Sequence, residues 1–186
     1  TGAFLLAWFQ GWIPSYMQQR IEVILDHSLY PMGAGWHQGR SIIAFGSGGW
    51  FGQGLFHGTQ TQSDSSSLPA RHTDFIFSVA GEELGYIGCI AIIVLLVAII
   101  LRCLVVARQA KTPMGALICV GFAAMLGFQM LENIGMCIFV MPVIGLTLPF
   151  FSYGGSSIIT MYAAMGMVSS DKMRSLPSWL RDRSKL

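Results

Sequence analysis

The sequence predicts an all-α polytopic membrane protein, a helical bundle with a long extracytoplasmic loop that contains interfacial or re-entrant segments. Of its 186 residues, 53% are hydrophobic and 11% are charged, whereas a soluble domain carries about 25% charged residues. Residues 85–101, 112–131 and 133–170 contain no charge. A helix that crosses the bilayer core needs roughly 20 mostly apolar residues. These stretches therefore predict transmembrane helices and exclude a free-standing soluble domain.

The apolar stretches and the polar segments between them divide the chain. An apolar run opens the sequence, and it is too short to span a bilayer. Four segments are predicted: 1–14, the end of a truncated transmembrane helix; 15–73, a large extracytoplasmic loop; 74–170, three transmembrane helices at about 75–105, 114–140 and 156–168; and 171–186, a cytoplasmic tail. The apolar connection between the last two helices is interrupted by Gly and Pro, so we expect it to pack into the bundle.

Basic residues predict the orientation. Arg102, Arg108 and Lys111 fall in one short connection, and the tail after residue 171 carries a second basic cluster. Two predicted spans separate these clusters, so both lie on one side, which the positive-inside rule assigns to the cytoplasm. The long loop is then outside. The net charge of +2, without a dense basic patch, excludes a nucleic-acid partner.

The long loop contains a glycine-rich stretch without charge. Residues 41–57 mix aromatic and aliphatic side chains with glycine, which is typical of a segment at the membrane interface or in a protein-lined cavity. Residues 46–54 (GSGGWFGQG) lack the ending of a phosphate-binding loop. Two interpretations remain open: the glycines allow close backbone packing, or exposed N–H groups bind an anion.

The cysteines and histidines predict neither a disulfide framework nor a metal motif. Cys89, Cys103, Cys119 and Cys137 all fall in or at the ends of predicted spans. Cysteine there behaves as a small hydrophobic residue, so we expect all four to pack in the core. The four histidines have no common zinc-site spacing.

Acidic residues in the predicted spans are the candidate functional groups. Asp74 precedes Phe75 at the outer mouth of a span and is either a helix N-cap or a catalytic or binding carboxylate. Glu82 and Glu83 fall two turns deeper, on faces about 80° and 180° away from Asp74 in a continuous helix. Glu132 is expected to bond across helices or to be protonated.

Residues 72–88 (HTDFIFSVAGEELGYIG) resemble the SEDS family of bacterial cell-wall proteins. Further blocks agree with that family: 16–20 (YMQQR), 31–37 (PMGAGWH), 41–60 (SIIAFGSGGWFGQGLFHGTQ), 133–136 (NIGM) and 142–157 (PVIGLTLPFFSYGGSS). The GTQ of the third block is closer to the RodA branch than to the FtsW branch. The resemblance implies about ten spans, of which this chain is the C-terminal half. Ala70 departs from the family pattern, which has Glu there.

The resemblance also implies an activity. It indicates a peptidoglycan glycosyltransferase of the bacterial inner membrane that polymerises lipid II for cell elongation and rod shape. The family's essential outer-loop acid falls on Asp74, which we expect to act as general base and to contact a divalent cation, Mg²⁺ or Mn²⁺. Expected substrate contacts are Arg40, Ser47, Gly48, Gly49, Arg71, His72, Glu83, Ser152, Tyr153 and Ser156.

The same resemblance implies partners. We expect undecaprenyl-diphosphate-linked glycan, membrane lipids and a class B penicillin-binding protein, which is a transpeptidase. Trp50, Phe51 and Phe56 either line a groove for polyprenyl chains or anchor the loop at the interface. The alternative functions are a lipid II flippase or transporter and a membrane scaffold for the penicillin-binding protein.

Overall fold

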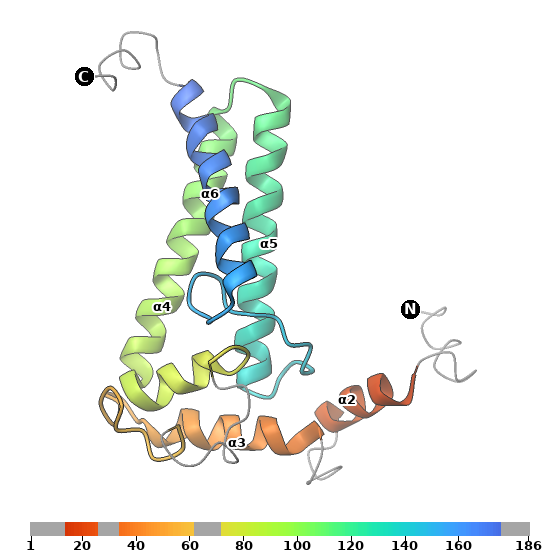
Figure 1. The fold of residues 1–186 in the computed structure, drawn as a ribbon, viewed down its shortest axis with the longest axis vertical. Coiled ribbons are helices and arrows are strands. Elements are labelled where there is room, and N and C mark those ends of the chain that lie inside the picture. The colour runs from red at the N-terminus through yellow and green to blue at the C-terminus, as the bar shows by residue number, and fades with distance from the viewer. Residues whose placement is uncertain (1–13, 26–33, 62–71, 176–186) are drawn as a thin grey trace.

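The computed structural model describes residues 14–25, 34–61 and 72–175. These residues contain helices and no strands: α2 (Ser15–Leu25), α3 (Ala34–Ser47), α4 (Ile76–Gln109), α5 (Pro113–Cys137) and α6 (Gly155–Ser175). Helices α4, α5 and α6 run side by side, and α2 and α3 lie across one end of this bundle (Figure 1). The predicted helix end at 1–14 and most of the predicted tail lie outside the described residues.

Two of the described helices, α4 and α5, are long and apolar enough to cross a membrane. They are unlike core helices of a soluble protein, because large apolar side chains such as Val94, Leu95 and Leu117 remain exposed along them. Helix α6 lies beside them (Figure 1) but is less apolar and does not meet the same criterion. The third span stays a prediction.

The two ends of the bundle differ in charge. We call the end with the α4–α5 connection and the last turn of α6 the basic end, because it carries Arg108, Lys111, Lys172 and Arg174. At this end Lys172 Nζ donates a hydrogen bond to Gln109 Oε1. We call the opposite end, where α3 lies, the loop end (Figure 1). The two basic clusters therefore share one side, as the sequence predicts.

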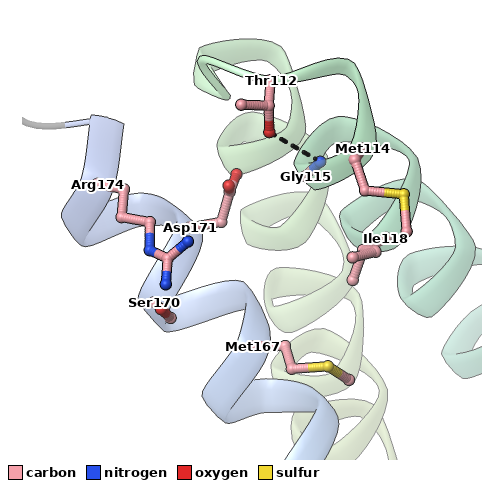
Figure 2. A pocket seen from close by; sticks show the side chains of 8 residues that line it. All are labelled: Thr112, Met114, Gly115, Ile118, Met167, Ser170, Asp171 and Arg174. Atoms are coloured by element: carbon pink, nitrogen blue, oxygen red, sulfur yellow. Dashed lines mark hydrogen bonds between the residues drawn. The ribbon is translucent and has the colours of Figure 1, made fainter.

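Helix α5 begins at the basic end with a regular N-terminus. The Thr112 side chain caps it by accepting a 3.2 Å hydrogen bond from the Gly115 N–H, and Pro113 follows at the first helical position. Figure 2 shows Asp171 of α6 directed toward this turn, beside a cavity of about 270 Å³. A Cβ on Gly115 would lie 2.2 Å from Asp171 Oδ1. Glycine thus lets the Asp171 carboxylate approach the positive end of α5.

Helix α4 is not the continuous span that the sequence predicts. Gly85 has φ 70° and ψ −171°, which interrupts the helix. Its first turns lie along α3 at the loop end, and α4 runs along the bundle only after Gly85 (Figure 1). Glu82 and Glu83 are therefore at the bend and not two turns deeper, and the expected angles from Asp74 do not apply because Asp74 precedes the helix.

The glycine-rich loop fills this break in α4. The Gln53 and Gly54 N–H groups donate to the carbonyls of Glu82 and Glu83, at 2.8 and 3.1 Å. In return, the Tyr86 and Ile87 N–H groups donate to the carbonyls of Gly49 and Trp50, at 3.0 and 3.3 Å. The loop thereby satisfies backbone groups that the bend in α4 removes from the helical ladder, which is essential at membrane depth.

Two buried clusters of apolar side chains hold the helices together. The first lies near the loop end and includes Phe77, Met130, Met136, Cys137 and Leu148. The second joins α4, α5 and α6 and includes Cys103, Cys119, Phe122, Leu126 and Met161. All four cysteines are free and buried, which confirms the prediction that they pack in the core.

Candidate functional site

Asp74 lies just before α4 and does not cap it. The N-cap of α4 is Phe75, and no side-chain hydrogen bond caps this helix. The Asp74 carboxylate is half-buried and forms no hydrogen bond or ion pair with the described parts of the chain. Its Oδ2 lies 3.5 Å from the position that a Cβ on Gly145 would take. The capping interpretation is therefore wrong, and the carboxylate is left available for a ligand.

The backbone beside this carboxylate is held by the α5–α6 connection and by α5. Ser152 Oγ donates to the Thr73 carbonyl at 2.7 Å, and the Tyr153 N–H donates to the His72 carbonyl at 2.9 Å. From α5, Asn133 Nδ2 donates to the Asp74 carbonyl at 2.9 Å. Asp74 thus combines a fixed backbone with a free carboxylate.

The α5–α6 connection is itself packed into the loop end, as predicted. Leu148 and Pro149 are buried, and Ser152 is 3% exposed. The Ser152 hydroxyl accepts a 2.8 Å hydrogen bond from the Leu148 N–H while it donates to Thr73. Because the Ser152 hydroxyl both donates and accepts a hydrogen bond, it fixes the connection against the segment that leads into Asp74.

An uncharged cavity of about 320 Å³ adjoins this arrangement, and its wall mixes apolar side chains with hydroxyl and amide groups. Its polar side chains come from α5, from the α5–α6 connection and from the start of α6. The lining residues are Met125, Gln129, Gly145, Leu146, Thr147, Ser156, Ser157, Thr160 and Met161. Gly145 lines the cavity and also faces the Asp74 carboxylate, so this acid borders the cavity at that glycine. The hydroxyl and amide groups of the wall can form hydrogen bonds with a neutral, hydroxyl-rich ligand such as a sugar.

Some of the predicted contact residues lie close to Asp74. His72 and Tyr153 are exposed and joined by their backbones, Ser152 is buried below them, and Ser156 lines the cavity. The structure therefore brings these four residues and Asp74 into one region. Arg71, the remaining predicted neighbour, lies outside the described residues.

The other predicted contacts lie on α3 or at the bend of α4. Arg40 is on α3, with its guanidinium 5.4 Å from the centre of the Trp36 ring, and it forms no ion pair with Asp74. Ser47 Oγ donates to the Ala44 carbonyl at 2.8 Å. Gly48 approaches α4 so closely that a Cβ would lie 2.0 Å from the Gly81 carbonyl oxygen.

The loop amides favour the packing interpretation of the glycine-rich stretch. The Gly52 N–H donates to the Gly48 carbonyl at 2.8 Å, and the next two N–H groups donate to α4. Gly49, whose carbonyl accepts from Tyr86, belongs to the same contact. Glu83, which is 9% exposed, lies at this bend, and its backbone carbonyl accepts the hydrogen bond from the Gly54 N–H. The amides of residues 52–54 are thus used within the protein, not presented to an anion.

Glu82 is a structural acid that sequence reasoning did not recognise. Its carboxylate is fully buried and accepts hydrogen bonds from the Gln60 N–H at 2.7 Å, the Thr61 N–H at 3.0 Å and Thr59 Oγ1 at 3.3 Å. The only hint in the sequence is the acid's position after a glycine-rich loop. For Glu132, the expected bond across helices is not seen, because its buried Oε1 has no partner in the described chain.

The described residues do not form a metal site by themselves. No group of three or more His, Cys, Asp or Glu side chains gathers in residues 14–25, 34–61 and 72–175. Asp74 alone supplies too few ligands for Mg²⁺ or Mn²⁺. The divalent cation expected at Asp74 stays a prediction.

The fold and site together define a helical membrane protein in which the Asp74 carboxylate, without a hydrogen bond to the described residues, lies where the α5–α6 connection, α4 and α5 meet. The family model described as "Cell cycle protein", FTSW_RODA_SPOVE, matches residues 2–175. The chain therefore belongs to the FtsW/RodA/SpoVE family, which confirms the SEDS resemblance. Membership of this family also confirms the all-α polytopic membrane fold class.

Relatives and solved structures agree with this assignment. "Peptidoglycan glycosyltransferase MrdB" of Escherichia coli (strain K12) is 44% identical over 155 residues, which are 83% of this chain and 41% of that protein. The chain thus spans about two fifths of the length of this relative.

Two solved structures are similar to the chain. The first is described as "Structural coordination of polymerization and crosslinking by a peptidoglycan synthase complex". It is 31% identical, with a TM-score of 0.69 over 95% of this chain and 49% of that one. The second is a mutant of the Thermus thermophilus rod shape determining protein RodA. It is 40% identical, with a TM-score of 0.52 over 69% of this chain and 37% of that one.

Proposed function

We propose that the protein is a peptidoglycan glycosyltransferase that polymerises lipid II into glycan strands for cell elongation and rod shape, with Asp74 as general base. The observation that carries this proposal is the state of Asp74. Its backbone is fixed by Asn133, its carboxylate is free of hydrogen bonds to the described chain, and an uncharged cavity that carries hydroxyl and amide groups adjoins it. The names of the relatives support the activity.

The proposed reaction is a displacement at an anomeric carbon. A sugar hydroxyl of one lipid II molecule attacks the anomeric carbon of the growing strand, and the bond from that carbon to undecaprenyl diphosphate breaks. The diphosphate leaves with the bonding electrons. Asp74 accepts the hydroxyl proton as the new C–O bond forms, because a neutral hydroxyl is a weak nucleophile without a base. The new glycosidic bond thus replaces the bond to the diphosphate, and the hydroxyl proton ends on Asp74.

Two kinds of substrate contact support this step. We propose that hydroxyl and amide groups of the cavity, including Ser156, hold the sugar next to Asp74. We propose that Arg40, Arg71 and His72 contact the diphosphate, whose negative charge grows as it leaves. The roles of Ser47, Gly48, Gly49 and Glu83 in binding stay predictions, and the structure supports a packing role for the two glycines.

The proposed substrates also constrain the location. Lipid-anchored substrates present their sugars at the outer surface of the bacterial inner membrane, and Asp74 lies at the loop end of the bundle. The basic clusters are at the opposite end, and the positive-inside rule favours a cytoplasmic location for them. We therefore propose that residues 15–73 are extracytoplasmic and that the C-terminus is cytoplasmic.

A class B penicillin-binding protein is the proposed partner. One similar structure is described as coordinating polymerisation and crosslinking in a peptidoglycan synthase complex. A polymerase that works beside a transpeptidase would deliver new strands directly for crosslinking. The exposed apolar side chains of α4 and α5 leave surface that a membrane partner or lipid can cover.

The proposal is tested by giving lipid II to the purified full-length protein, with and without a class B penicillin-binding protein. We expect glycan strands, resolved by length on a gel, and release of undecaprenyl diphosphate in proportion to the bonds formed. Movement of fluorescent lipid II across liposomes without any polymer would instead indicate a transporter. If strands form only when the penicillin-binding protein's own catalytic activity is intact, the penicillin-binding protein and not this protein is the polymerase.

A further inference from the structure

Asn133 connects the segment that carries Asp74 to the wall of the uncharged cavity beside it. The side chain lies in the last turns of α5 and is fully buried. Its Nδ2 donates to the Asp74 carbonyl at 2.9 Å and to the Leu146 carbonyl at 2.7 Å. Both hydrogens of one amide group are thus used, and they join two segments that are distant in sequence.

The Asp74 carbonyl depends on this bond more than a helical carbonyl would. The first turn of α4 uses the Phe75 carbonyl, which accepts from the Ser78 and Val79 N–H groups at 3.0 and 3.2 Å. The Asp74 carbonyl lies outside this ladder. Besides Asn133, it has a distant contact with Cys137 Sγ at 3.9 Å, and thiols are weak donors. Asn133 therefore fixes the Asp74 peptide.

The second bond of Asn133 fixes the opposite side of the site. Leu146 follows Gly145, whose Cβ position is 3.5 Å from Asp74 Oδ2, and both residues line the cavity. Gly145 has φ 81°, a conformation that favours glycine. One amide group thus sets the spacing between the Asp74 carboxylate and the surface on which a sugar would rest.

We propose that Asn133 is a positioning residue for Asp74, an inference that rests on the function proposed above. It does not touch the reacting atoms. It holds the carboxylate at the distance from the cavity at which a bound hydroxyl can donate its proton. Proton transfer needs the acceptor within hydrogen-bond reach, and a displacement of about 1 Å can lower a rate about 100-fold.

Gln38 of α3 provides a matched control. It is also a buried amide, 1% exposed, and its Nε2 also donates to two carbonyls, those of Met136 at 3.2 Å and Met141 at 2.8 Å. Its bonds hold α3 to the end of α5 and to the same connection, but they do not involve Asp74. A general loss of packing would affect variants of Gln38 and Asn133 alike.

The test compares Asn133→Leu with Gln38→Leu in the full-length protein supplied with lipid II. We expect both substitutions to lower the melting temperature. Asn133→Leu alone should lower kcat at least about tenfold, because the base is misplaced, and it should also change KM for lipid II, because the Leu146 side of the cavity loses its hydrogen bond. In an Asp74→Ala background, Asn133→Leu should cause no further loss.

A milder variant, Asn133→Ser, tests the inference if Asn133→Leu does not fold. Asn133→Ser keeps a single donor, so we expect an intermediate kcat. Equal losses of kcat in the Gln38 and Asn133 variants, or an unchanged kcat in Asn133→Ser and Asn133→Leu, would overturn the inference. If Asp74→Ala itself polymerises normally, the proposed base is wrong, whatever the Asn133 variants do; normal Asn133 variants beside an inactive Asp74→Ala reject only the positioning role.

Discussion

The buried carboxylate of Glu82 accepts a 2.7 Å hydrogen bond from the backbone N–H of Gln60. This contact joins the far end of the glycine-rich loop to the bend in α4. With the bonds from Thr59 and Thr61, it supplies hydrogen-bond donors to both oxygens of this buried side chain. The glycine-rich loop is therefore part of the folded core of the loop end.

Glu82→Gln should destabilise the loop end. The variant presents an NH₂ group where an oxygen now accepts backbone N–H groups, so at least one buried donor loses its partner, at a cost of about 1–3 kcal/mol. We expect a lower melting temperature of the purified full-length protein and faster protease cleavage near residues 58–61. Glu22→Gln on α2, where Glu22 is half-buried, is the control. Equal melting temperatures for the two variants would contradict the anchoring role.

Gly52→Ala should lower the stability of the protein, because backbone atoms occupy the space that the new methyl group needs. Its Cβ would lie 2.1 Å from the Glu83 carbonyl oxygen, and φ at Gly52 is 76°. We expect a loss of more than about 1 kcal/mol in stability. Gly46→Ala, in α3 with open space around it, should be neutral or stabilising. Thermal unfolding of both variants checks this, and similar effects would argue against the close contact.

Ser152→Ala should loosen the connection from the chain before Asp74. The substitution removes the Ser152 hydroxyl bonds to the Thr73 carbonyl and from the Leu148 N–H, and loss of the acceptor for the buried N–H costs about 1–3 kcal/mol. Ser175→Ala, at the last residue of α6, should change stability by less than about 0.5 kcal/mol. Hydrogen exchange at Leu148 provides the local measurement. Unchanged protection there would exclude the hydroxyl as the link.

The two ends of the bundle should be accessible to a labelling reagent from opposite sides of the membrane. His57→Cys, at an exposed loop residue, should be labelled in intact cells by a maleimide that cannot cross membranes. Lys111→Cys, at an exposed residue of the basic end, should be labelled only after permeabilisation. The native cysteines are buried, so the unmodified protein is the background control. The reverse labelling pattern would contradict the proposed topology.

The sequence was sufficient for the class of fold, because charge-free stretches have few alternatives to membrane helices. It did not predict the bend at Gly85. A glycine within an apolar run is compatible with a straight helix, and the bend depends on backbone bonds from a loop more than 30 positions earlier in the chain, between Gly49 and Tyr86. Such pairing leaves no local pattern in either segment.

The site was also predicted in part. Resemblance to a family selected Asp74, whereas residue type alone favoured a helix cap, and only the structure shows that Phe75 is the cap. Asn133 stands in a block that resembles the family, but its residue type and its place beside Glu132 indicate no role for it. Its importance comes from two carbonyls that tertiary packing brings to it. The glycine-rich loop illustrates the opposite problem, since its pattern allowed an anion site that its internal bonds disfavour.

The central claim is that the Asp74 carboxylate acts as general base in strand synthesis, and one rate comparison tests it most directly. Asp74→Asn and Asp171→Asn make the same change at opposite ends of the bundle, so we expect both proteins to insert and fold. With lipid II and the partner transpeptidase, Asp74→Asn should reduce the rate of glycan formation at least about 100-fold, while Asp171→Asn stays near the native rate. A native rate of glycan formation by correctly inserted Asp74→Asn would contradict the claim.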